Sequence, residues 1–304
     1  RTSGIRARRK IASNCPEVVN ALPPDLRENV NAFEFAVDDH LIKTLGMEWY
    51  PNTDGIGYRV RHLDGVPDSA KDVKRAEREA NRRLKLQIAV PVPAIELCVS
   101  SVPLTKRKVL SDIAKIFDPL GLLSCVVIVL KICMQEIWMT KLSWDDILPE
   151  EVTVNFVERR NEMVRLRELS VPRRIVEDPE SDYELHVFCD ASEKAYGACV
   201  YVRQVVNGVA KVNFLTSNTK VTTLKKLTIP KLELCAAHLG MQLLEAVKYS
   251  LRFSGVTATI FAWSDSTTVL NWLSAYPGRL LTFVSNRVAQ IQEHIARVDW
   301  YHVP

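Results

Sequence analysis

The order of strand and helix patterns between Tyr183 and Pro304 limits the possible folds of this chain more than any other feature. Short runs rich in apolar and β-branched residues predict strands at 184–189, 195–203, 209–216, 258–263 and 298–303. Helical patterns occupy 230–251, a segment that starts at Ser266, and about 281–296. The resulting order, β-β-β-α-β-α-α-β, predicts an α/β or α+β domain in which a five-stranded mixed sheet is flanked by helices.

The region before residue 183 predicts a β-hairpin followed by mainly helical structure. Two β-rich runs, 41–49 and 56–60, flank Asp54-Gly55, which is typical of a hairpin turn. The helix over 122–139 is apolar nearly all round and is therefore expected to be buried. The remaining helices are predicted over 69–86, from a capping Thr105 to about Phe117, and over 150–168, with a linker at 90–103 and a domain boundary at 171–182.

Composition indicates the class of protein and its possible partners more clearly than its function. The chain has 304 residues, of which 47% are hydrophobic and 25% charged, as expected for a globular protein of about two domains. The net charge of +4 is compatible with a nucleic-acid partner, although the basic cluster 6–10 is more often a solvated tail in such chains. The longest apolar stretch, 120–130, is too short to span a bilayer, so no membrane partner is expected.

The cysteines and the chain ends give further expectations. Seven scattered cysteines without a C-x-x-C pair indicate a reducing, intracellular setting, either cytoplasmic or nuclear. No signal peptide is evident. The sequence starts without Met and stops within a strand pattern, so we expect a fragment of a longer protein.

Three carboxylates, Asp190, Glu233 and Asp265, stand at the ends of apolar or capped segments. Taken singly, they have simpler explanations: a turn residue, a complement to a helix dipole and a helix N-cap, respectively. Together, two Asp at the carboxyl ends of strands and a Glu on an adjoining helix can point into one cleft, where a cation would offset their repulsion. Oxygen ligands suit Mg²⁺ or Mn²⁺, and two metal ions held by acids are a common solution for phosphodiester cleavage.

Several motifs around these acids resemble a known family. The C-terminal ones are Phe188-Cys189-Asp190-Ala191-Ser192, Ala195-Tyr196-Gly197-Ala198, Thr228-Ile229-Pro230-Lys231-Leu232-Glu233-Leu234, Trp263-Ser264-Asp265-Ser266 and Trp300-Tyr301-His302-Val303-Pro304. The upstream ones are Leu45-Gly46-Met47-Glu48-Trp49, Phe117-Asp118-Pro119-Leu120-Gly121, Gln135-Glu136-Ile137-Trp138 and Leu142-Ser143-Trp144-Asp145. In this order they resemble the Pol polyprotein of BEL/Pao long-terminal-repeat retrotransposons, with a ribonuclease H domain at the C-terminal end.

The resemblance implies a division of the chain and an activity. Residues 1–63 would be the C-terminal palm part of a reverse transcriptase and 64–178 a helical thumb or connection region. Residues 183–304 would be a ribonuclease H-like domain, truncated before its last helix. Such a domain hydrolyses the RNA strand of RNA/DNA hybrids. Asp190 would bridge two Mg²⁺ ions, and Glu233 and Asp265 would each complete one side.

The expected partners are an RNA/DNA hybrid and other parts of the Pol polyprotein. Lys220, Lys225, Lys226 and Lys231 flank the start of the Glu233 helix and could contact the phosphate backbone, or could form a solvated basic loop. Ser192 and Ser266 lie beside the acids and could orient the nucleic acid or simply cap the next segment.

One departure from the family pattern and two look-alike motifs qualify this interpretation. The ribonuclease H family uses a fourth acid on a helix after the last strand, beyond Pro304, so binding of a second metal is expected to be weak. Val37-Asp38-Asp39 mimics a polymerase site but lies too close to Leu45, so this fragment is not expected to synthesise DNA alone. Asp265-Ser266-Thr267 resembles the Asp-Ser-Gly of aspartic peptidases only loosely. The alternatives are a non-catalytic nucleic-acid-binding fragment and a structural scaffold.

Overall fold

The computed structural model describes residues 42–44, 47–50, 53–58, 103–178, 181–251, 258–296 and 299–303. These residues fall into two compact units, the first within 1–97 and 162–174 and the second within 98–161 and 175–304. The predicted helix at 69–86 and the Val37-Asp38-Asp39 motif lie outside the described residues. The division of the chain into palm, thumb or connection, and ribonuclease H parts at residues 63 and 178 follows from the family resemblance and stays a prediction.

The first unit contains a four-stranded antiparallel sheet in the order β1-β2-β3-β4. The strands are β1 (Ile42–Thr44), β2 (Met47–Tyr50), β3 (Gly55–Tyr58) and β4 (Ser170–Pro172), and a 3-10 helix, η4, spans Met163–Glu168. The predicted hairpin is present between β2 and β3, and Asp54 in its turn has a φ of 49°. The sequence patterns did not predict β4, which pairs with β3 although Tyr58 and Ser170 are 112 positions apart (170 − 58 = 112).

Three helices precede the large sheet of the second unit, namely α3 (Lys106–Ala114), α4 (Ser124–Met139) and α5 (Glu150–Glu162). Thr105 caps α3 as predicted, because its hydroxyl oxygen accepts a hydrogen bond from Lys108 N at 3.3 Å. A buried ion pair of 3.4 Å between Asp112 and Arg160 joins α3 to α5. The prediction that the helix at 122–139 is buried all round is wrong, since Trp138 and Met139 are 51% and 66% exposed.

The second sheet has five strands in the order β7-β6-β5-β8-β9 and is mixed, as predicted. They are β5 (Tyr183–Ala191), β6 (Ala195–Val206), β7 (Val209–Val221), β8 (Ala258–Ser264) and β9 (Trp300–His302). Strand β6 is antiparallel to β5 and β7, whereas β8 runs parallel to β5, and β9 parallel to β8. Asn207 and Gly208, with φ of 52° and 77°, form the predicted tight turn between β6 and β7.

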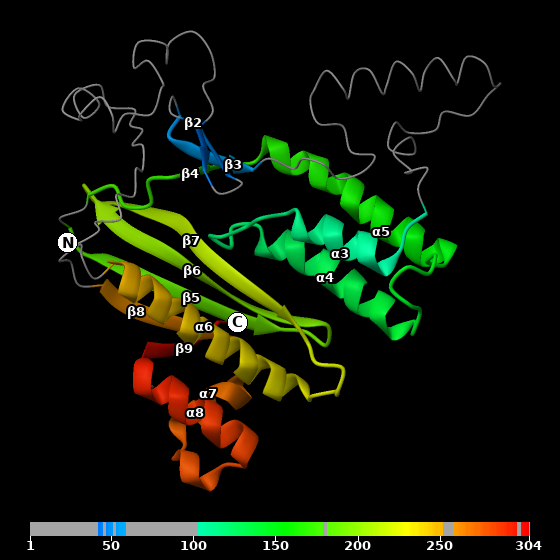
Figure 1. Ribbon diagram of the computed structural model, residues 1–304. Helices are drawn as coiled ribbons and strands as arrows, with labels where there is room; N and C mark the ends of the chain where they lie inside the picture. The colour runs from blue at the N-terminus through cyan, green and yellow to red at the C-terminus, as the bar shows by residue number, and fades with distance from the viewer. Residues whose placement is uncertain are drawn as a thin grey trace, which may run out of the picture. The chain divides into compact units, whose positions relative to one another are not determined.

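Helix α6 (Ile229–Leu251) covers one face of this sheet (Figure 1), and the smaller helices α7 (Thr267–Ser274) and α8 (Thr282–His294) pack beside it. Alternate residues of β5 (Leu185, Val187 and Cys189) are buried on the α6 face. Gly240 lets the helix approach closely, because a Cβ at this position would overlap Cys189 Sγ. No helix among the described residues is long and apolar enough to cross a membrane.

Candidate active site

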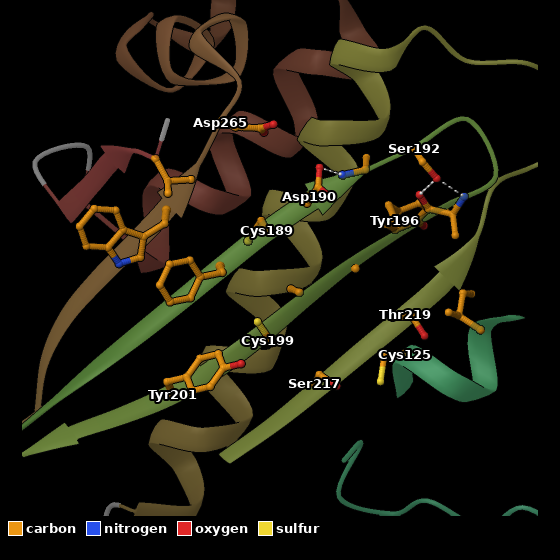
Figure 2. A pocket seen from close by; sticks show the side chains of 18 of the residues that line it. Cys125, Cys189, Asp190, Ser192, Tyr196, Cys199, Tyr201, Ser217, Thr219 and Asp265 are labelled. Carbon is orange, nitrogen blue, oxygen red and sulfur yellow. Dashed lines mark hydrogen bonds between the residues drawn. The ribbon is translucent and has the colours of Figure 1, made fainter. Parts of the chain in front are cut away.

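Asp190 and Asp265 meet at one edge of the five-stranded sheet. The parallel pairing of β5 with β8 ends at Cys189 and Ser264, and each acid is the next residue in the sequence. The carboxyl ends of adjacent parallel strands lie side by side, so the topology brings the two acids together. Both side chains are exposed and line the same pocket, and Figure 2 places them at one end of it.

The simpler explanations of these two acids do not hold. The N-cap of α7 is Ser266, whose buried hydroxyl accepts a hydrogen bond from Val269 N at 3.3 Å, so Asp265 is not used as the cap. The turn after β5 is closed by Ser192, whose hydroxyl accepts from Ala195 N at 3.2 Å. Asp190 makes only a local contact there, accepting from Ala191 N at 2.6 Å. Both serines therefore have structural partners, and their contact with nucleic acid stays a prediction.

Glu233 lies on α6, a helix that begins at the same edge of the sheet, but it is not among the residues that line this pocket. Strand β7, parallel to β5, ends at this edge, and α6 begins seven residues after Thr222. Glu233 is half-buried and lies seven residues, about two helical turns, before Gly240. Because Gly240 faces Cys189, Glu233 lies on the side of α6 that faces the sheet, close to the helix start.

The pocket is a cavity of about 710 Å³ on the sheet face opposite α6. Its floor is aromatic, with Phe188 and Trp263 stacked at 5.9 Å between ring centroids, and Tyr201 beside Phe188. One wall comes from the beginning of α4, where Cys125 and Ile128 line the cavity. Cys125 is labelled on this helix in Figure 2. The acids thus lie at the end of a groove that is formed by both the sheet and α4.

The donor chemistry of the acids fits a hard divalent cation. None of Asp190, Glu233 and Asp265 forms an ion pair with a cationic side chain in the described part of the chain. Carboxylate oxygens that lack a cationic partner are the ligands that Mg²⁺ prefers. Within the same described ranges, however, no three His, Cys, Asp or Glu side chains are grouped closely enough to hold a metal ion. The structure therefore brings two of the three acids together and leaves the third on the neighbouring helix.

Basic side chains surround the acid-bearing edge. Lys220 lies near the end of β7, Lys225 and Lys226 in the exposed loop after it, and Lys231 at the start of α6. The Lys231 ammonium lies 5.7 Å from the Phe283 ring centroid, and the Arg287 guanidinium lies 3.7 Å from the same centroid. Two cations from different helices therefore converge on one ring beside the helix that carries Glu233.

Sequence reasoning missed Phe283, Arg287 and the aromatic floor. The signal for the first pair is their four-residue spacing on an amphipathic helix, which puts them on one face. The signal for the floor is that Phe188 and Trp263 each stand two residues before one of the two aspartates, at the end of a strand pattern.

Burial and hydrogen bonding set the protonation of several groups in the second unit. Burial raises the pKa of the Cys189 thiol, next to Asp190, far above its usual range, so this thiol is neutral and unreactive. The pKa of Glu184 is lowered by hydrogen bonds from His186 at 3.0 Å and Arg203 at 2.7 Å. The pKa of His238 is lowered, first by desolvation and then by nearby cations, and its ring contacts Gln290 at 2.7 Å.

The five-stranded mixed sheet and its helices define a ribonuclease H-like fold. A family described as "Pao retrotransposon-like RNaseH-like domain" matches residues 105–266, which is 162 of the 304 residues (266 − 105 + 1 = 162). The chain therefore belongs to this family and is consistent with a fragment of a retrotransposon Pol protein. The matched segment begins at α3 and includes both the helices before the sheet and the two aspartates.

Two solved structures are similar to parts of the chain. RNase H1 from the halophilic archaeon Halobacterium salinarum NRC-1 is 15% identical, with 41% of this chain and 86% of that chain covered and a TM-score of 0.25. The protease-reverse transcriptase of prototype foamy virus is 13% identical, with 62% of this chain covered and a TM-score of 0.28. The aligned part is 25% of the foamy virus chain. A search of curated proteins finds no match.

Proposed function

We propose that the second unit hydrolyses the RNA strand of RNA/DNA hybrids. The observation that carries this proposal is the placement of Asp190 and Asp265 at the carboxyl ends of adjacent parallel strands in a Pao ribonuclease H-like domain, with no cationic partner among the described residues. Acids at this edge of the sheet lie where the catalytic groups of open α/β sheets are found.

Asp190, Glu233 and Asp265 are proposed to hold Mg²⁺ or Mn²⁺, and a metal bound there would lower the pKa of a water and stabilise the leaving oxygen. The two aspartates anchor the site because their backbone positions are fixed by the paired strands. Glu233 would complete it from the first part of α6, on the side of the helix that faces the sheet.

The basic side chains around the edge are proposed to contact the phosphates of the hybrid. Lys220, Lys225, Lys226 and Lys231 lie on the elements that lead into α6, and Arg287 extends the positive surface on α8. Affinity from such contacts falls with salt concentration. Preference for RNA would come from hydrogen bonds to 2′-hydroxyls in the shallow groove of the hybrid.

The first unit is proposed to be the end of a reverse-transcriptase palm, with the helices after it acting as a thumb or connection region. The hairpin of β2 and β3 supports this proposal, because it is the element to which the Leu45-Gly46-Met47-Glu48-Trp49 motif contributes. We expect no DNA synthesis from this chain alone.

A second candidate is a protein that binds hybrid without cleaving it. The observation that favours it is that no group of three metal-binding side chains is assembled within the described residues. In that case the basic edge would still bind hybrid, with Asp190 and Asp265 unused.

A cleavage assay separates the two candidates. The full chain is incubated with Mg²⁺ and an end-labelled RNA annealed to DNA, and with the same RNA annealed to RNA. We expect cleavage of the hybrid alone, and its loss in Asp190→Asn but not in the matched control Asp182→Asn at the other end of β5. Binding of hybrid without cleavage by the unaltered chain would reject the nuclease and support the binder.

A further inference from the structure

Helix α4 lies along the edge strand β7 and is joined to it at both ends. Near the start of the helix, the Thr219 hydroxyl donates to Ser124 O at 3.1 Å and the Ser124 hydroxyl donates to Ser217 O at 3.2 Å. Near its end, Gln135 Nε2 donates to Thr222 O at 2.6 Å. Ser124 and Gln135 are eleven helical steps apart, a rise of about 16 Å, and Ser217 and Thr222 are five extended steps apart, a rise of about the same length. The contacts at the two ends are therefore equally far apart along the helix and along the strand.

The approach at the start of α4 is a backbone contact. Gly121 has a φ of 71°, and a Cβ at this position would overlap Ser217 O. The Thr216 hydroxyl donates to Leu120 O at 2.7 Å, and the Ser217 hydroxyl donates to Gly121 O. Because these bonds involve main-chain carbonyls, they fix the position of the helix whatever its surface residues are.

The contact at the other end leads to the turn that follows Asp190. Thr222, whose carbonyl accepts from Gln135, donates its own N–H to Lys194 O at 3.0 Å and its hydroxyl to Glu193 O at 2.9 Å. Both acceptors belong to the β5–β6 turn, which is closed by Ser192 N donating to Ala195 O at 2.8 Å. A continuous chain of hydrogen bonds therefore runs from α4 through Thr222 to the turn two residues beyond Asp190.

A second link between α4 and this turn is weaker. Lys194 Nζ lies 3.0 Å from Glu136 Oε1, but the two side chains are 68% and 47% exposed. Exposed ion pairs contribute little because water and salt screen them. The half-buried Gln135, which bonds to a carbonyl at short distance, is the stronger of the two links.

We propose that Gln135 is a positioning residue for the active site, acting through Thr222 on the turn that follows Asp190. This inference rests on the proposed nuclease function. It assigns helix α4 a part in the reaction, because α4 lines the pocket and is hydrogen-bonded, through Thr222, to the turn after Asp190. The family match agrees with this, because it spans α3 to Ser266 as one segment.

The test compares three single variants of the full chain. Gln135→Met keeps the length of the side chain and removes the donor, Gln135→Lys restores a donor, and Lys131→Met is the control on an exposed face of α4. We expect Gln135→Met to lower kcat on hybrid by about 10- to 100-fold, with KM nearly unchanged and a higher Mg²⁺ concentration for half-maximal rate. Gln135→Lys should recover most of the loss, and Lys131→Met should behave as the unaltered chain.

Hydrogen exchange measures the positioning without relying on activity. The amide of Ser192 should exchange faster in Gln135→Met than in the unaltered chain, while amides in the centre of β6 should not change. If kcat, the Mg²⁺ requirement and this exchange rate are all unaltered in Gln135→Met, the proposal is wrong. If the unaltered chain cleaves no hybrid, the proposed function fails by itself, and the exchange rate at Ser192 still decides whether Gln135 holds the turn.

Discussion

Asp190 and Asp265 occupy equivalent positions, one residue beyond the last parallel pair of β5 and β8, and they share a pocket. This relationship follows from topology, because two parallel neighbours end at the same edge of a sheet. Two carboxylates so placed repel each other unless a cation joins them. The proposed hydrolysis of RNA depends on that cation.

The first prediction concerns stability in the presence of metal. Mg²⁺ should raise the melting temperature of the unaltered chain, because a ligand that binds only the folded state stabilises it, by about 2.7 kcal/mol at a hundred times its Kd. Asp265→Asn should lose most of this gain, whereas Asp145→Asn, an exposed acid paired with Arg107, should keep it. Thermal unfolding with Mg²⁺ and with a chelator measures the effect. Equal gains in the two variants would contradict it.

The second prediction concerns the cap of α7. Ser266→Ala should lower the free energy of unfolding by about 1 kcal/mol, the usual loss for an N-cap serine, because Val269 N loses its acceptor. Ser266→Thr should keep most of the stability. Urea denaturation measures both. If the alanine variant is as stable as the unaltered chain but binds hybrid less tightly, Ser266 acts on the nucleic acid instead.

The third prediction concerns pH. Burial raises the pKa of Cys189 in the folded protein, whereas the thiol of the unfolded chain has a pKa of about 8.5. Above the pKa of the unfolded thiol, the unfolded state therefore releases a proton that the folded state keeps. The contribution of Cys189 to stability is complete below that pKa and declines as the pH rises above it. The free energy of unfolding should fall between pH 8 and pH 10.

The control for this pH dependence is Cys189→Ala. Urea denaturation at several pH values should give a smaller slope for the variant, whatever its stability at pH 7. Cys133 and Cys199, whose pKa values are also raised by burial, should account for part of the remaining slope. Identical slopes for the two proteins would show that Cys189 does not contribute.

The fourth prediction concerns the basic surface on α8. Arg287→Ala should weaken hybrid binding and reduce the slope of log K against log salt concentration by about one, the change expected for one lost phosphate contact. Arg159→Ala, on the exposed side of α5, is the control. Fluorescence titrations at several salt concentrations measure the slope. A slope that is unaffected by the loss of Arg287 would remove this residue from the binding surface.

Local patterns sufficed to predict the element order of the second unit. Residues 183–189 alternate between buried and partly buried side chains, and Asn207-Gly208 has a turn signature that depends on only two residues. The cap of α7 was harder, because Asp265 and Ser266 are both good caps and only the geometry of the helix start selects Ser266.

Contacts between distant segments were not predictable. The bonds from Gln135 and Ser124 to β7 join residues 87 and 93 positions apart, and no local periodicity encodes them. The pairing of β4 with β3 is of the same kind. The exposure of Trp138 and Met139 was missed for a related reason, since an apolar sequence shows which residues are hydrophobic but not how many neighbours cover them.

The most direct test of the central claim is the position of a bound metal. Mn²⁺ added to the isotope-labelled full chain broadens the amide signals of nearby residues in NMR spectra. The account predicts selective broadening at Asp190, Glu233 and Asp265, with Asp182 at the far end of β5 unaffected. Broadening that spares Glu233, or that is spread over all exposed acids, would contradict a shared metal site.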